Sequence, residues 1–172
     1  MASSPEDIQQ QIVDHLKTIP IFERLTTSEI QRIYSLCAFN RYRPDDLIYK
    51  FGDPSGSLFV LLDGQVVART KTGVDIAYIS PVGVVGEMGV LTDEPRSADV
   101  VAFDDVMGFE ISKEGLVDLF LEDGSICRKI LLNVIKILSA KLYDTNAEIE
   151  KLREEASKPV TTQNEADNIF LY

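Results

Sequence analysis

The spacing of apolar residues changes twice along this chain of 172 residues. Before residue 46, apolar positions recur every three or four residues, which predicts helices. Between 46 and 111, short apolar runs alternate with turn-forming residues about every ten positions, a pattern typical of strands. Helical spacing returns after Ser112. No helical pattern separates the strands, so we expect an α+β fold with an antiparallel β-sandwich or jelly-roll barrel between two groups of helices.

Local signals mark the ends of the first helices. Ser4 and Pro5 suit the start of a first helix, which Pro20 ends. Thr26 followed by Glu29 has the spacing of a capping box and predicts the start of a second. The apolar face of this second helix is expected to consist of Ile30, Ile33, Tyr34 and Cys37.

The last helix is predicted to run over 126–156, after a break at Gly124 and Ser125. One apolar set on it is expected to pack on the β unit: Ile126, Ile130, Val134 and Ile137. A second set has the spacing of a coiled-coil seam, interrupted at Thr145, and predicts a homodimer through this helix. An ordinary core helix is the alternative. The seam consists of Leu131, Ile135, Leu138, Leu142, Thr145, Ile149 and Leu152.

Charge and composition exclude several classes of function. A net charge of −11 repels a phosphate backbone, so we expect no nucleic acid partner. The longest uncharged stretch, 76–86, is too short to span a membrane. Two cysteines in apolar surroundings favour a reducing, cytoplasmic compartment. With His15 as its one histidine, placed on a helix surface, the chain is not expected to hold a metal.

A short segment at 86–91 interrupts the strand pattern and leads through Pro95 to Arg96. Arg96 is the one basic residue among eight carboxylates over 72–112. A helical turn there would leave backbone N–H groups unpaired at its start, which favours an anion, and arginine fits two phosphate oxygens. Glu87 suits a neutral hydroxyl pair, such as a ribose edge. The alternative is a surface turn in which Arg96 pairs with Glu87, Asp93 or Glu94.

This stretch resembles the phosphate-binding cassette of the cyclic nucleotide-binding domain family, which includes catabolite activator proteins and protein kinase A regulatory subunits. The family pattern is roughly F-G-E-x-[AG]-L, then P-R-[STA]-A-x-V. The chain has V-G-E-M-G-V-L over 85–91 and P-R-S-A-D-V over 95–100. The resemblance covers about 16–152 and implies a short cassette helix. Departures from the pattern are Val82, Gly83 and Val85.

The resemblance implies a role for each cassette residue. Glu87 would bind the ribose 2′-hydroxyl and Arg96 the phosphate oxygens. Ser97 would favour cAMP over cGMP as the ligand. Lys141 and Thr145 are the candidates for contacts to the base. The remaining ligand-binding candidates line the phosphate or lie in the same turn: Gly86, Met88, Gly89, Ser97 and Ala98.

The function implied by the resemblance is a stand-alone sensor module that binds a cyclic nucleotide and couples its cassette to the last helix. It is not expected to be an enzyme or to carry a DNA-binding domain. The alternatives are a ligand-free dimerisation or interaction module and a cupin-type enzyme. We expect a flexible segment at 1–7, the binding domain at 8–156 and a polar tail at 157–172, a candidate contact for a protein partner.

Overall fold

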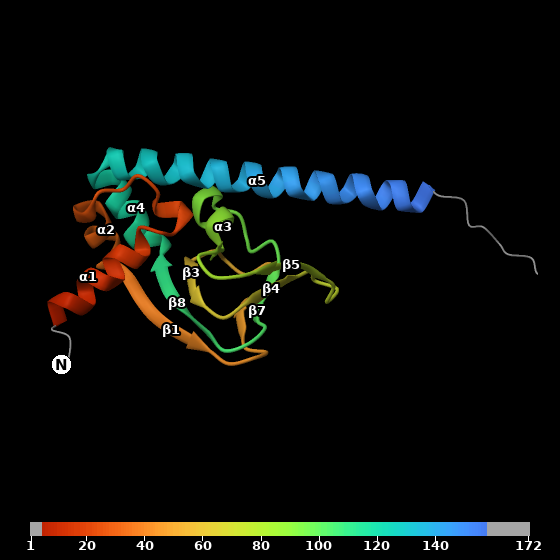
Figure 1. Cartoon of the computed structure of the whole chain (residues 1–172), viewed down its shortest axis with the longest axis horizontal. Helices are drawn as coiled ribbons and strands as arrows, with labels where there is room; N and C mark the ends of the chain where they lie inside the picture. Colours follow the sequence, from red (N-terminus) through yellow and green to blue (C-terminus); the bar gives the residue numbers. More distant parts are fainter. Residues whose placement is uncertain (1–4, 158–172) are drawn as a thin grey trace, which may run out of the picture. The chain divides into compact units, whose positions relative to one another are not determined.

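The computed structural model describes residues 5–157 and has helices on both sides of a β unit in the sequence (Figure 1). The helices are α1 (Pro5–Leu16), η1 (Pro20–Phe22), α2 (Thr27–Tyr34), α3 (Glu87–Thr92), α4 (Lys113–Glu122) and α5 (Gly124–Ser157). The strands are β1 (Cys37–Tyr42), β2 (Leu47–Tyr49), β3 (Ser57–Asp63), β4 (Val66–Arg69), β5 (Asp75–Ile79), β6 (Val84–Val85), β7 (Asp99–Ala102) and β8 (Val106–Ser112).

The strands form two antiparallel sheets, each of four strands in the described chain, with the orders β1-β8-β3-β6 and β2-β7-β4-β5. Apolar side chains from both sheets meet in one core, as in a β-sandwich. This arrangement confirms the predicted α+β fold of the jelly-roll type. The core contains Tyr49, Phe59, Leu61, Val66, Val85, Val100, Ala102 and Val106.

Strand β1 differs from the prediction, which placed the first strand after residue 46. The second helix ends at Tyr34, and Cys37 begins β1 instead of extending the helical face. All six residues of β1 pair with β8, from Cys37 with Ile111 to Tyr42 with Val106. Pairing with β8 decides the structure of this segment in place of its local helical spacing. Because β8 lies far along the chain, the local pattern does not reveal this pairing.

The predicted helix signals near residues 26 and 112 are confirmed. Thr26 and Glu29 form a capping box at the start of α2. The Ser112 side chain accepts a hydrogen bond from the backbone N–H of Gly115 at the start of α4. For α5 the cap is Asp123, whose carboxylate accepts hydrogen bonds from the backbone N–H groups of Ser125 and Ile126. Gly124 and Ser125, expected to break the chain, are already helical.

The start of α5 contacts the N-terminal part of the chain, where Lys129 pairs with Glu29 of α2. Of the four residues predicted to face inward, Ile126, Ile130 and Val134 are buried and Ile137 is half-buried. Asn133 is buried as well, and its amide donates to the carbonyls of Ile21 and Glu23. Because this buried amide makes both hydrogen bonds, it fixes the position of α5 against the segment that contains Ile21 and Glu23.

The chain divides into two compact units within α5, at Met1–Ile137 and Leu138–Tyr172. The first unit holds both sheets and the whole cassette. Of the second, the structure describes the rest of α5 to Ser157, so Ser157 is helical rather than part of the predicted tail. Residues 5–7, expected in a flexible segment, belong to α1. The remainder of that tail, 158–172, lies outside the described residues.

Candidate functional site

The short segment predicted between the strands is helix α3, which follows β6 directly. Gly86 caps it with a left-handed backbone, at φ 81°, and Asp93 ends it with another, at φ 62°. Glycine adopts this conformation without the steric cost that other residues incur. The chain therefore turns sharply into α3 and out again, which returns it toward Arg96.

The glycines of α3 are required by contacts within the protein. A Cβ on Gly86 would lie 2.9 Å from Cε2 of Tyr49 and would collide with the Arg96 guanidinium. A Cβ on Gly89 would lie 2.6 Å from the Cβ of Ser55. Side chains of the protein itself therefore occupy the space beside both glycines.

Arg96 is buried, with 7% of its surface exposed. Its Nη1 donates to the carbonyl oxygen of Gly86 at 3.2 Å, and its Nη2 donates to that of Ser57 at 2.6 Å. Asp93, one of the alternative partners for a surface turn, pairs with Lys113 instead. Carbonyl dipoles thus stabilise a charge that would be costly to bury without hydrogen bonds.

The ring of Tyr49 forms the platform for this guanidinium, with Cζ of Arg96 3.5 Å from the ring centroid. Burial raises the pKa of Tyr49 to about 12, so the ring stays neutral at ordinary pH. Its hydroxyl lies 3.2 Å from Oγ of Ser57. Ser57 in turn donates to Glu110 at 2.5 Å, and Asn40 donates to the same carboxylate at 2.8 Å. This network of Asn40 in β1, Ser57 in β3 and Glu110 in β8 holds the Tyr49 ring in place.

Glu87 begins α3 and is also buried, with 5% of its surface exposed. Glutamate is rarely buried to this extent unless other groups stabilise its charge. A carboxylate in the first turn of a helix interacts favourably with the positive end of the helix dipole. The structure therefore places two buried, oppositely charged side chains at the ends of one loop, Glu87 at its start and Arg96 at its end.

The other predicted residues differ in exposure. Gly89 is buried, Met88 has 50% of its surface exposed, and Ala98 is partly buried beside the exposed Ser97. Lys141 and Thr145 belong to the second unit, where the Thr145 hydroxyl donates to the carbonyl of Lys141. The structure thus brings the residues of 86–98 together in the first unit, and the two base candidates remain a prediction.

Sequence reasoning missed Tyr49, Ser55 and Ser57. Ser55 is buried and donates to the carbonyl of Glu94, which ties the loop after β2 to the loop before Arg96. Tyr49 faces Val100 through the pairing of β2 with β7. No spacing in the sequence links these positions to the cassette, because strand pairing between distant segments brings them there.

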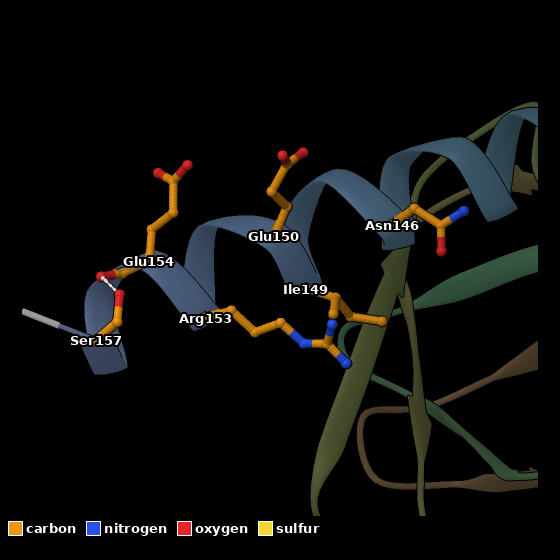
Figure 2. Close-up of a pocket in the computed structure, with 6 residues that line it drawn as sticks. All are labelled: Asn146, Ile149, Glu150, Arg153, Glu154 and Ser157. Carbon is orange, nitrogen blue, oxygen red and sulfur yellow. Dashed lines mark hydrogen bonds between the residues drawn. The ribbon is translucent and has the colours of Figure 1, made fainter.

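A pocket in the second unit has a different character. Its lining residues all come from the last turns of α5, so this helix alone forms it (Figure 2). Figure 2 shows Ile149 and Arg153 on one side of the helix, with Glu150 and Glu154 on the other. The lining residues are Asn146, Ile149, Glu150, Arg153, Glu154 and Ser157. These groups have none of the burial that marks Glu87 and Arg96.

Neither a metal site nor a membrane span is found among the described residues. No group of three or more histidine, cysteine, aspartate or glutamate side chains within 5–157 is arranged to hold a metal ion. In the same part of the chain, no helix combines the length and apolar character that a membrane span requires.

Residues 39–123 match the family model described as the cyclic nucleotide-binding domain. The match contains both sheets except the first two residues of β1, as well as α3, Glu87 and Arg96. This part of the chain belongs to the cyclic nucleotide-binding domain family, of the type found in catabolite activator proteins and protein kinase A regulatory subunits.

Relatives with this domain differ in the rest of their sequence. The chain is 30% identical over 146 residues to glutaminase 2 of Bradyrhizobium diazoefficiens, covering 85% of this chain and 23% of the relative. It is 30% identical over 124 residues to a cAMP-dependent protein kinase regulatory subunit of Colletotrichum orbiculare, covering 72% of this chain and 32% of the relative. The chain thus spans no more than about a third of either protein.

A solved structure has the same fold over most of its length. A cyclic nucleotide-binding domain from Methylobacillus flagellatus KT superposes with a TM-score of 0.73 at 22% identity, covering 84% of this chain and 83% of that one. In this family the domain is a regulatory, ligand-binding one, and residues 39–123 of the chain match it.

Proposed function

We propose that this chain is a cyclic nucleotide sensor in which 86–98 bind the sugar and phosphate, with cAMP preferred over cGMP. The observation that carries the proposal is the burial of Glu87 and Arg96 on one loop. Glu87 accepts hydrogen bonds from the ribose 2′-hydroxyl, and Arg96 donates to the phosphate oxygens. Gly86, Met88, Gly89, Ser97 and Ala98 complete the lining.

The environment of Arg96 supports this role. A guanidinium has more N–H donors than the carbonyls of Gly86 and Ser57 use, so further donors remain for a phosphate. Tyr49 holds the plane of the guanidinium, which limits its conformational freedom before the ligand arrives. Preorganisation of this kind lowers the cost of binding.

Signal output is proposed to pass through α5. Nucleotide binding draws α3 toward Arg96 and changes the apolar surface of Val90 and Leu91, and 123–125 act as the hinge. The identity of the base is proposed to be sensed by Lys141 and Thr145.

A homodimer through 126–156 is part of the same proposal. Most of the seam side chains are exposed within one chain, with 59% of Ile135, 63% of Leu142 and 57% of Leu152 accessible. Exposed apolar residues at heptad spacing favour pairing with a second helix. A protein partner at the tail 157–172, a cytoplasmic location and the lack of a catalytic activity of its own complete the proposal.

One observation favours the alternative, a ligand-free interaction module. The charge of Arg96 is already stabilised by two carbonyls and an aromatic ring, so the fold does not require a phosphate. Isothermal titration with cAMP and cGMP separates the two functions. We expect saturable binding that is tighter for cAMP and that Arg96→Lys weakens. A chain that binds neither nucleotide would establish the alternative.

A further inference from the structure

A basic pocket lies within the first unit, between the turn after η1 and the first turns of α5. Its volume is about 330 Å³. Its lining combines basic and aliphatic side chains, with Asn133 beside them: Arg24, Arg128, Lys129, Lys136, Leu132 and Ile135. Four cationic groups at one place are unusual in a chain with a net charge of −11.

Two of these four cations already have carboxylate partners. Lys129 pairs with Glu29 at 2.7 Å, and Lys136 pairs with Glu23 at 3.3 Å. Over 12–157, no carboxylate comes within ion-pair distance of Arg24 or Arg128. The pocket can therefore bind further carboxylates without breaking an ion pair that the fold uses.

The turn that carries Arg24 is held in place. Arg24 has a left-handed backbone, with φ 66°, which costs energy for a residue with a side chain. The buried Asn133 amide donates to the carbonyls of Ile21 and Glu23, immediately before Arg24. The first turns of α5 thus fix the turn beside Arg128, and the two arginines belong to one preformed surface.

The apolar part of the lining narrows the class of ligand. Leu132 has 46% of its surface exposed and Ile135 has 59%, one and two turns beyond Arg128 on α5. A small inorganic anion would leave these side chains in water. A nucleic acid carries charge along its whole length, so beyond this pocket its phosphates would meet the repulsion of an acidic protein, whereas a short acidic segment need contact only the basic residues. Arginine beside exposed aliphatic residues is typical of surfaces that bind proteins.

From this arrangement, we propose that the basic pocket docks an acidic peptide segment of a partner protein. Carboxylates of the segment bind Arg24 and Arg128, and a neighbouring aliphatic side chain of the segment packs on Leu132, which is not part of the proposed dimer seam. The proposal is independent of nucleotide binding, because neither arginine belongs to the cassette.

The test is fluorescence anisotropy of the full chain with a labelled peptide of repeated Glu-Leu-Leu-Glu units. The double variant Arg24→Asn with Arg128→Gln removes both free cations, and asparagine tolerates the left-handed backbone. We expect about a tenfold loss of affinity, from roughly 1.4 kcal/mol of lost ion pairing. A peptide with Gln in place of Glu is expected to bind the unchanged protein about tenfold more weakly as well.

The matched control removes two positive charges elsewhere on the surface, by Arg43→Gln with Lys71→Gln. It should keep the affinity of the unchanged protein to within about twofold, since distant surface charges are screened by salt. Thermal melting of both double variants checks that they are folded. No binding by the unchanged protein, equal losses in the two double variants, or equal binding of the Gln peptide would each overturn the proposal.

Discussion

The arginines of the cassette and of the basic pocket occupy opposite environments. Arg96 is buried, donates to two carbonyls and lies over an aromatic ring, whereas Arg24 and Arg128 are exposed. The fold depends on the contacts of Arg96, and it holds Arg24 and Arg128 without using their charges. Substitutions in the cassette should therefore change stability and ligand affinity together, and substitutions in the pocket should change binding alone.

The largest effect is expected for Arg96→Lys. Lysine cannot supply the planar fork, so it loses the bidentate phosphate contact and one of the two carbonyl contacts. Nucleotide affinity should fall by about 2–5 kcal/mol, or roughly 30- to several-thousand-fold. Isothermal titration measures the affinity, and thermal melting should show a lower midpoint. Arg24→Asn serves as the control and should change neither value. Unchanged cAMP affinity in a folded Arg96→Lys variant would remove Arg96 from the site.

The next effect concerns packing beneath α3. Gly89→Ala places a methyl group 2.6 Å from the Cβ of Ser55 and 2.7 Å from the carbonyl oxygen of Glu94. Overpacking of this kind costs about 1–3 kcal/mol of unfolding free energy. Urea denaturation measures it. Gly124→Ala is the matched control, because nothing lies within 4 Å of the added Cβ there. Equal stability of the two variants would mean that α3 moves freely over the loop at Ser55.

A smaller effect tests the partner of Glu87. Glu87→Gln should weaken binding of cAMP and should matter much less for 2′-deoxy-cAMP, which lacks the hydroxyl that Glu87 is proposed to bind. The double cycle of variant and analogue should give a coupling of about 1 kcal/mol. If the two losses add without coupling, Glu87 stabilises the cassette in another way and does not contact the ribose.

The smallest effect concerns the platform under Arg96. Tyr49→Leu removes the ring, whose cation–π contact with a buried cation contributes about 2 kcal/mol. Because this contact exists before the ligand binds, most of the loss should appear in stability, and cAMP affinity should fall several-fold. Tyr49→Phe keeps the ring, loses the hydroxyl contact to Ser57 and should bind nearly as well as the unchanged protein. Titration of both variants distinguishes the ring from the hydroxyl. A greater loss in Tyr49→Phe than in Tyr49→Leu would assign the role to the hydroxyl.

Much of the fold could be predicted from local signals. The capping box at Thr26 and Glu29 and the cap at Ser112 lie within a few residues of the helices they begin, so their spacing is visible in the sequence. The same holds for the turn at Gly86 and for the inward face of α5 at Ile126, Ile130 and Val134. The family resemblance rested on the cassette together with other local motifs between 16 and 152, and the match over 39–123 confirms the family.

Other features depend on contacts between distant parts of the chain, and only the tertiary structure decided them. Strand β1 exists because it pairs with β8. Tyr49 meets Arg96 because β2 pairs with β7. Arg24 and Arg128 line one pocket because Asn133 ties the turn after η1 to α5. Helix caps and turns are set by neighbours in sequence, whereas strand partners and pocket walls are chosen by the burial of apolar surface throughout the folded unit.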